Sequence, residues 1–534
     1  MPPRYRVIAD AALEDTFTLQ GVTARQPRLS NGGYAWNWKG PNDDPEWAWF
    51  FNRHGWFKCL WRAYTRTKEG AKKRGYRGAI FGTLNDWIEA NPAPGRFNFS
   101  AAWRPLEVAR RLLDSWLPLM DDLLGDSDLS DGLRAKLKAS LLDHGRHLRR
   151  HHALGGNHLI TEMRALLYLG YSNSDFVESA DWIEYGLSKM DAAYLKQVYP
   201  DGVHKELSSH YHRIITQDFS ALVEMLVAAG VVDQVDVWRQ RVDLLWHYLK
   251  CITKPNGMNP INNDCDLEDF GKLLRKEAPQ SIAAEHLSSC HFPWAGQTIF
   301  RNDALKQWAF FDAGPRGTDH AHDDHLNFIF SVDEADFLID PGRYTYAPSA
   351  WRDYFRGARG HNIVLLDSFS SDQNGSEAFV KDASICYQST LSEVSASGTT
   401  VFYDAKPRRL ADWNRSITYD QQYKWCVRDE VITFGSRRMQ TLWHWHSDCR
   451  FSGDVLSEEG LIIKNGVQAI RMRLKTDNRI LNSMEVISGV VGAEIQGWYS
   501  PRFNYKEAAP VFVFKQEIIG PCWNEWEFCV LPNL

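Results

Sequence analysis

The sequence predicts a helical N-terminal half followed by an antiparallel β-sandwich. Between residues 47 and 285, apolar residues recur at spacings of three and four, the period of amphipathic helices. Beyond residue 292 the pattern changes to short apolar runs between turn residues, which is typical of strands. Helices first and strands afterwards favour segregated domains over alternating βαβ units. We expect domains at residues 1–290 and 291–534.

The helical half is expected to hold many antiparallel helix pairs. Its clearest amphipathic segments cover residues 106–117, 133–148, 159–169, 211–229 and 235–251. Turn signals rich in Gly, Asp, Asn or Pro separate several of them, at residues 126–128, 200–202 and 255–257.

The strand-like half is a series of short apolar runs. They cover residues 307–312, 326–332, 337–339, 362–366, 431–434, 461–464 and 511–514. Several Trp residues there and near the N-terminus stand among polar neighbours, such as Trp36, Trp443 and Trp445. Such rings suit sugar faces, although large aromatics also fill cores.

Composition narrows the function classes. The chain has 534 residues, 44% of them hydrophobic and 24% charged, as expected for two or three large globular domains. A net charge of -6 supplies no basic field, so we expect neither nucleic acid nor membrane as partner. Nine scattered cysteines without a C-x-x-C pair suggest neither a disulfide framework nor a cysteine zinc site.

The N-terminal sequence predicts no export. It lacks the basic start, apolar core and small-residue cleavage site of a signal peptide, and no run of about 18 apolar residues follows. We expect a cytoplasmic protein from the sequence as given, or a periplasmic or secreted one if a signal has been removed.

The first polar cluster follows two glycines at an expected helix start. Structurally, Asn157 would be an N-cap, with His158 and Glu162 one turn apart on the helix. Functionally, an amide and an imidazole at a helix N-terminus suit a bound carboxylate. The sequence leaves both interpretations open.

A second cluster runs from residue 201 to 212. His204 and Glu206 lack the second histidine, one turn along, of a metalloprotease H-E-x-x-H motif, so we exclude that class. Tyr211 is either a core tyrosine with a satisfied hydroxyl or a functional group.

The third cluster is the richest in metal-ligand residues. His320 and His322, two positions apart, would share one face of a strand. Neighbouring strands could bring Asp340 and His361 beside them. Two imidazoles and one carboxylate form the ligand set of a zinc site that water or another ligand would close.

Three arginines follow this cluster. Arg352, Arg356 and Arg359 are either surface charges or a clamp for a carboxylate or sulfate group.

Together these motifs resemble the heparinase II/III-like family of polysaccharide lyases, which also includes oligoalginate lyases. The matching segments, in order, are residues 51–54, 156–158 with Glu162, 201–202 with 211–212, 320–323, 339–342 and 361–364. The resemblance implies an N-terminal incomplete (α/α) toroid, a C-terminal antiparallel β-sandwich and an active cleft between them.

The resemblance also implies residue roles in β-elimination. Asn157 and His158 would neutralise the uronate carboxylate, while Tyr211 and His320 would transfer protons, with the base and the acid left unassigned. Tyrosine, with an ordinary pKa near 10, needs nearby cations to act as a base. The residues implied in substrate binding are Asn52, Arg53, His54, Glu162, His212, Tyr354 and Arg359.

The resemblance further implies one structural metal ion per chain, zinc or another divalent cation. The residues at the matching positions are His322, Asp340 and His361.

We therefore expect a lyase acting on a glycosaminoglycan of the heparin/heparan or hyaluronan/chondroitin kind, ahead of alginate or a bacterial exopolysaccharide. One alternative is a glycoside hydrolase, for which Glu162 and Glu206 are the only attractive carboxylate pair. The other is a non-catalytic relative that binds polysaccharide or capsule. The expected partner is an acidic polysaccharide or oligosaccharide, with a homo-oligomer as a further option.

Overall fold

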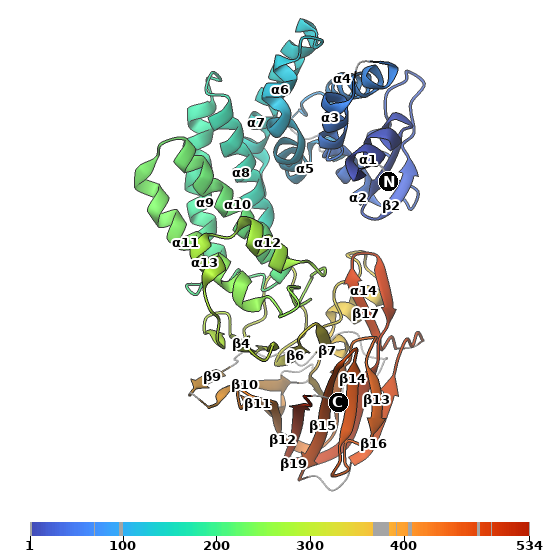
Figure 1. Cartoon of the computed structure of the whole chain (residues 1–534), viewed down its shortest axis with the longest axis vertical. Helices are drawn as coiled ribbons and strands as arrows, with labels where there is room; N and C mark the ends of the chain where they lie inside the picture. Colours follow the sequence, from blue (N-terminus) through green and yellow to red (C-terminus); the bar gives the residue numbers. More distant parts are fainter. Residues whose placement is uncertain are drawn as a thin grey trace. The chain divides into compact units, whose positions relative to one another are not determined.

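A computed structural model of the chain describes residues 3–68, 70–95, 100–366, 384–390, 392–403, 408–477, 481–492 and 494–532. The chain forms two compact units, Met1–Lys196 with Gln217–Arg239, and Gln197–Thr216 with Gln240–Leu534. Two helices, α10 (Ser209–Ala228) and α11 (Val232–Ile252), each contribute to both units. The expected change from helices to strands is present (Figure 1), and it begins with β3 (Cys290–Phe292). The domain division at residue 290 stays a prediction.

The first unit is almost entirely helical. Its elements are α1 (Arg4–Leu13), β1 (Thr16–Leu19), β2 (Val22–Arg25), α2 (Pro45–Asn52), α3 (Phe57–Arg66), α4 (Ala71–Ala90), η1 (Ala101–Trp103), α5 (Pro105–Arg111), η2 (Leu112–Trp116), η3 (Leu117–Leu119), α6 (Met120–Gly125), α7 (Asp131–His151), α8 (Gly156–Ser172) and α9 (Ser179–Gln197). Each periodic segment expected in the sequence falls on a helix. The segment 106–117 is the irregular one, because α5 passes into a π-helical turn, η2, at Leu112.

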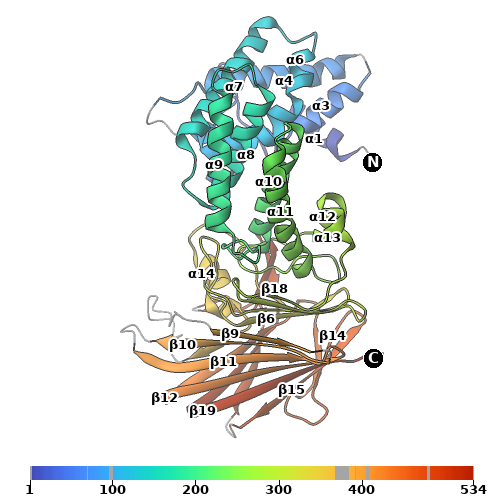
Figure 2. The same cartoon turned by 90° about the vertical axis from the view of Figure 1, so that its left-hand side faces the viewer.

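The second unit holds the two large sheets. Strands β3, β4 (Gln297–Asn302), β5 (Gln307–Asp312), β6 (Asn327–Val332) and β7 (Ala335–Leu338) form one antiparallel sheet in sequence order. A larger antiparallel sheet has the order β13-β14-β15-β19-β12-β11-β10-β9, with β16 and β8 added to β19 and β12. Figure 2 labels the strands of this sheet from β9 to β14.

The strands of the larger sheet are β8 (Val364–Leu366), β9 (Ser384–Ser389), β10 (Val394–Tyr403), β11 (Arg409–Tyr419), β12 (Lys424–His444), β13 (Arg450–Gly453), β14 (Leu461–Asn465), β15 (Gln468–Thr476), β16 (Leu481–Ile487) and β19 (Val511–Val530). The hairpin β17 (Trp498–Arg502) and β18 (Tyr505–Ala508) and the helices α12 (Phe270–Glu277), α13 (Gln280–Ala284), α14 (Ala350–Arg356) and η4 (Ala358–Gly360) complete the unit.

The two large sheets share one apolar core, which confirms the expected sandwich. Phe330 of β6 contacts Trp425 of β12, with ring centroids 4.7 Å apart. Trp443 and Trp445 lie fully inside this core, and Trp36 is buried in the helical unit. These three rings are therefore packing residues, and the interpretation as sugar-stacking surfaces is wrong for them.

A buried ion pair lies within this core. Arg415 and Asp429 are both inaccessible to solvent, and the guanidinium contacts both carboxylate oxygens, at 2.7 and 3.0 Å. Arg415 also donates to the carbonyls of Leu326 and Asn362, and so connects the large sheet to the segments that precede β6 and β8.

Candidate active site

The centre of the candidate site is a stacked pair of rings. Tyr211, in the first turn of α10, lies face to face with His320, with ring centroids 3.7 Å apart and planes inclined by 10°. His320 belongs to the loop between β5 and β6. The expectation that His320 and His322 share a face of a strand is therefore wrong, because the chain turns at this point and strand β6 begins only at Asn327.

Asp264 joins the two histidines. His320 Nδ1 lies 3.1 Å from its Oδ2, and His322 Nε2 lies 2.9 Å from its Oδ1. Arg352 of α14 donates to both oxygens, at 2.5 and 2.8 Å. Burial favours the neutral acid, but hydrogen bonds from the two histidines and Arg352 outweigh it and hold the pKa of Asp264 well below its ordinary value.

The Tyr211 hydroxyl belongs to a second network. It shares a 2.5 Å hydrogen bond with the hydroxyl of Tyr346, which in turn accepts from Arg343. Asp266 holds that guanidinium through contacts of 3.0 and 2.6 Å. Burial, reinforced by Tyr346, raises the pKa of Tyr211 well above 10, although Arg343 opposes the shift. Tyr211 is thus a protonated phenol at neutral pH.

The start of α10 fixes Tyr211 in place. Ser208 donates through Oγ to the carbonyl of Asp264 at 2.8 Å, which joins this helix start to the segment that carries the carboxylate. His212 is buried, and its ring contacts the amide of His204 and the carbonyl of Leu245 at 3.2 and 3.0 Å. Its imidazole therefore braces the helix start and is not exposed for substrate.

The three expected metal ligands lie together. The ligand atoms of His322, Asp340 and His361 lie within 4.8 Å of one another, and all three residues are buried. His361 Nδ1 lies 3.1 Å from Asp340 Oδ2, which also accepts from Asn327 at 2.7 Å. One ligand atom of each residue is left buried without a hydrogen-bond partner, namely His322 Nδ1, Asp340 Oδ1 and His361 Nε2.

This donor set fits a divalent cation. Buried polar atoms are normally satisfied, and three unsatisfied ligand atoms converging on one point indicate a missing partner. The hydrogen bond from His322 to Asp264 is the support that metal-binding imidazoles usually have.

Other expected residues lie in the helical unit. Asn157 is buried and His158 half-buried in the first turn of α8, whose N-cap is Gly155, so Asn157 is not the cap residue. Gly156 has φ +67°, a conformation that favours glycine at this turn. Glu162 is buried and accepts from the amide of Ala153 at 2.6 Å. Burial raises its pKa to about 7.

Residues 52–54 are largely committed to internal contacts. Asn52 is fully buried and uses its side-chain amide on Trp87 and on the carbonyls of Trp36 and Ala48. His54 is fully buried and its Nδ1 accepts from Trp116 at 3.1 Å. Arg53 pairs with the buried Glu107. None of the three displays an open side chain of the kind that substrate contact would need.

Tyr354 and Arg359 are also engaged within the second unit. Tyr354 is buried, and its hydroxyl accepts from the amide of Trp498 at 3.2 Å. Arg359 pairs with Glu494 at 3.0 Å.

Sequence reasoning missed Asp264, Asp266, Arg343 and Tyr346. Asp264 and Asp266 stand in the polar run 262–266, which matches no spacing rule, and they reach the site only through the fold. Arg352 was one of three arginines in the third cluster, and the structure singles it out through its two contacts with Asp264.

The described helices can be compared with the length and hydropathy that a membrane-spanning helix needs. None of those in the described part of the chain is both long and apolar enough to span a bilayer.

Comparisons with known proteins place the chain in a family. A model of the heparinase II/III N-terminus matches residues 4–281, and a model of the heparinase II/III-like C-terminal region matches residues 286–516. A heparin-sulfate lyase of Bacteroides stercoris is 27% identical over 424 residues, 69% of this chain, and one of Pedobacter heparinus is 26% identical over 401 residues, 68% of this chain. The chain spans 61% and 58% of the length of these two relatives.

Solved structures confirm the fold. A crystal structure of heparinase III superposes with a TM-score of 0.83 at 17% identity, covering 99% of this chain and 85% of that one. The heparan sulfate lyase HepC of Pedobacter heparinus gives 0.70 at 21% identity, covering 99% and 83%. The expected toroid followed by an antiparallel sandwich is thus the architecture of this protein, and the chain belongs to the heparinase II/III family.

Proposed function

We propose that this chain is a lyase that cleaves a uronate-containing glycosaminoglycan by β-elimination, with heparin or heparan sulfate as its first substrate class. The observation that carries the proposal is the Tyr211–His320 stack, which puts two proton-transfer groups side by side on one anchored scaffold. The two relatives named heparin-sulfate lyases support the substrate class. They do not favour alginate.

His320 is suited to remove the proton. The ionised Asp264 accepts a hydrogen bond from Nδ1–H of His320. This leaves Nε2 as the nitrogen that can take up a proton. An orienting carboxylate of this kind also stabilises the imidazolium that forms. In the proposed reaction Nε2 takes the proton from C5 of the uronate, and the C–H electron pair becomes the C4–C5 double bond.

Tyr211 is suited to supply the leaving-group proton. Because its pKa is raised well above 10, the phenol keeps its proton at neutral pH. As the C4–O bond breaks, the Tyr211 hydroxyl would protonate the departing glycosidic oxygen. This assigns the base and the acid that the family resemblance leaves unassigned.

Asn157 and His158 enter the proposal through the family resemblance. The carbanion formed at C5 places negative charge on the uronate carboxylate, and hydrogen-bond donors must stabilise that charge. An amide and an imidazole in the first turn of α8, at the positive end of the helix dipole, have the right chemistry for this.

His322, Asp340 and His361 would hold a zinc ion. When bound, the ion would supply a rigid anchor for the segments that carry these three ligands. His322 contacts Asp264, and Asp264 contacts His320, so one of the metal ligands is two contacts away from the proposed base.

Ultraviolet absorbance of the unsaturated uronate tests this function. The full chain would be incubated with heparin, heparan sulfate, hyaluronan, chondroitin sulfates and alginate. We expect the absorbance to rise with heparin or heparan sulfate. Shortened products without the double bond would favour a glycoside hydrolase, and binding without shortening would favour a non-catalytic relative.

A further inference from the structure

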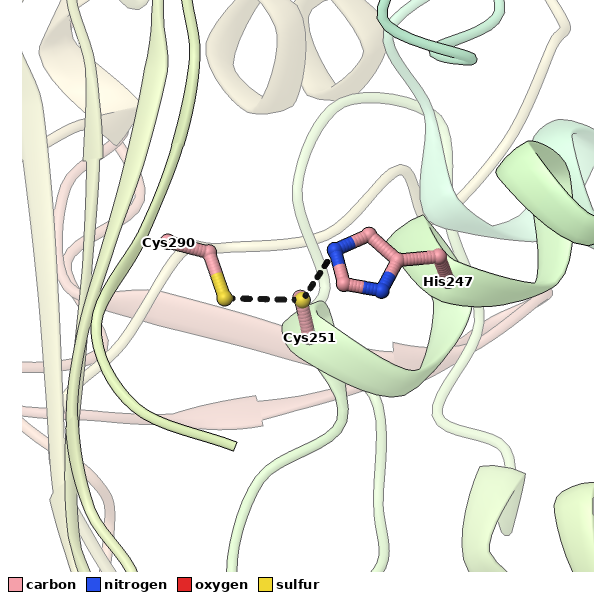
Figure 3. Close-up of side chains that lie close together, drawn as sticks. All are labelled: His247, Cys251 and Cys290. Carbon is pink, nitrogen blue, oxygen red and sulfur yellow. Dashed lines mark hydrogen bonds between the residues drawn. The ribbon is translucent and has the colours of Figure 1, made fainter. Parts of the chain in front are cut away.

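A second group of metal-ligand side chains lies apart from the candidate active site, between α11 and β3. His247 and Cys251 are one turn apart on α11, so both point from the same face of the helix. Cys290 is the first residue of β3 (Figure 3). Cys251 is buried, while His247 and Cys290 are half-buried, so an ion could enter from solvent.

The three ligand atoms have nearly the spacing of a tetrahedral site. Cys251 Sγ lies 3.5 Å from His247 Nε2 and 2.9 Å from Cys290 Sγ. Around a tetrahedral zinc ion, with bonds of about 2.3 Å to sulfur and about 2.0 Å to nitrogen, the corresponding separations are about 3.5 Å and about 3.8 Å. The nitrogen–sulfur pair already fits, and the two sulfurs would separate by less than about 1 Å.

Glu285 fixes the orientation of the imidazole. Its Oε2 lies 3.1 Å from His247 Nδ1, which directs the opposite nitrogen, Nε2, at Cys251. A carboxylate behind a histidine is the usual outer support of a metal-binding imidazole, because it selects the tautomer and raises ligand basicity.

The backbone around the site is held in place from both sides. Lys250, next to Cys251 on α11, donates to the carbonyls of Ile282, Ala283 and Glu285, so the segment before β3 is fastened to the helix. Arg301 donates to the carbonyl of Cys251 at 3.1 Å. The site is therefore preorganised by contacts that do not involve its ligand atoms.

We propose that His247, Cys251 and Cys290 bind a thiophilic divalent cation, zinc in the first place, with water as the fourth ligand. Two thiolates and an imidazole select zinc over magnesium or calcium. Binding releases the two thiol protons and links α11 to β3 across 39 residues of chain. The absence of a C-x-x-C motif hides this site in the sequence, because the fold, not local spacing, brings the cysteines together.

Cobalt(II) titration of the reduced, metal-free full chain tests the proposal. Cobalt bound to thiolates gives a sulfur-to-metal charge-transfer absorption, which a site of two histidines and one aspartate does not produce. We expect the band in the wild type, where up to two cobalt ions can bind per chain, and also in His322→Ala, where the other candidate metal site is disrupted and the band should saturate at one cobalt per chain.

Matched variants locate the signal. Cys290→Ser should abolish the band, whereas Cys59→Ser, which changes another half-buried cysteine in the helical unit, should keep it. Glu285→Gln should weaken cobalt affinity by about 10- to 100-fold while leaving the band itself present.

Three results would overturn the proposal: no charge-transfer band in folded, reduced wild-type protein, a band that persists unchanged in Cys290→Ser, or a Cys251–Cys290 disulfide that reductant does not open while the protein stays folded. The second variant, Glu285→Gln, retains all three ligands, so the proposal stays testable if Cys290→Ser fails to fold.

Discussion

At the scale of single residues, the surroundings of Tyr211 decide its chemistry. Its ring is held against His320, and its hydroxyl is held by Tyr346, which Arg343 contacts in turn. Burial makes the phenolate costly, and Arg343 compensates for only part of that cost. The same residue in open solution would have its ordinary pKa near 10 and would lose its proton at lower pH.

The pH dependence of kcat/KM tests this assignment. The charged or titratable groups that face Tyr211 are His210, Asp264, His320, Arg343 and Tyr346. The pKa of Tyr211 lies well above 10. If Tyr211 is the acid, its loss of a proton should therefore cause no decrease in kcat/KM below pH 10. Tyr346→Phe removes one cause of the raised pKa and should shift the alkaline fall to lower pH. A rate that climbs steadily up to and beyond pH 10 would instead make Tyr211 the base.

The raised pKa of Glu162 predicts that the stability of the folded chain depends on pH. Its pKa is about 7 in the folded chain because of burial, against an ordinary value of 4.5. The folded state therefore favours the protonated form, and this contribution to stability is complete below pH 4.5 and is lost as pH rises through 7. Glu162→Gln keeps the acceptor for the Ala153 amide and removes the charge. Its melting temperature relative to wild type should rise between pH 5 and pH 8; a constant difference would refute the shift.

The sequence predicts individual ligand residues better than their partners. His320, His322, Asp340 and His361 could be singled out because histidine and aspartate in dense clusters have few structural uses. Asp264 could not, since it stands 56 residues before His320 and gains its role only when the loops meet. Asn52 and His54 show that a polar residue in a matching segment can also form internal hydrogen bonds, and their implied role in substrate binding stays a prediction.

At the scale of elements, loops and strand ends bring the metal ligands together. His322 comes from the loop before β6, Asp340 follows β7, and His361 follows η4. The sequence-based prediction of a shared strand face was wrong, yet the three ligands still converge. The pairing of β6 with β7 brings the segments of His322 and Asp340 together, and His361 contacts Asp340.

Metal content tests this convergence. Purified protein should contain zinc that His361→Ala loses, and the variant should melt at a lower temperature because site and fold are linked. Elemental analysis of His361→Ala together with Cys290→Ser separates this ion from the one proposed at α11. Zinc content unaffected by His361→Ala would contradict the assignment.

Substitution of Arg415 tests how its ion pair with Asp429 connects the large sheet to the loops. Arg415→Met leaves the Asp429 carboxylate buried without its cation, which should cost about 3–5 kcal/mol. It also removes the donors to Leu326 and Asn362, the second of which directly follows His361. We expect a lower denaturation midpoint for the strand-rich unit. Replacing the exposed Arg409 by Met is the matched control, and an equal effect of both changes would argue against this role.

At the scale of the whole molecule, periodicity predicts the architecture because each half repeats one pattern many times. In the helical half, apolar residues recur every three or four positions, and in the strand-rich half they form short runs. The point where one pattern replaces the other lies within a few residues of β3, where the strands begin. Periodicity does not report that α10 and α11 contribute to both compact units, since a helix looks the same on either side of such a boundary. Substrate identity likewise depends on surfaces that no spacing rule describes.

The most direct test of the central claim compares wild-type protein with Tyr211→Phe on heparan sulfate, following the absorbance of the unsaturated uronate. The change removes one hydroxyl and keeps the ring that stacks on His320, so folding should be preserved and circular dichroism should match. We predict product formation by the wild type and a loss of at least about 100-fold in the variant, the contribution expected of a proton-transfer group. A folded Tyr211→Phe enzyme of normal rate would contradict the account.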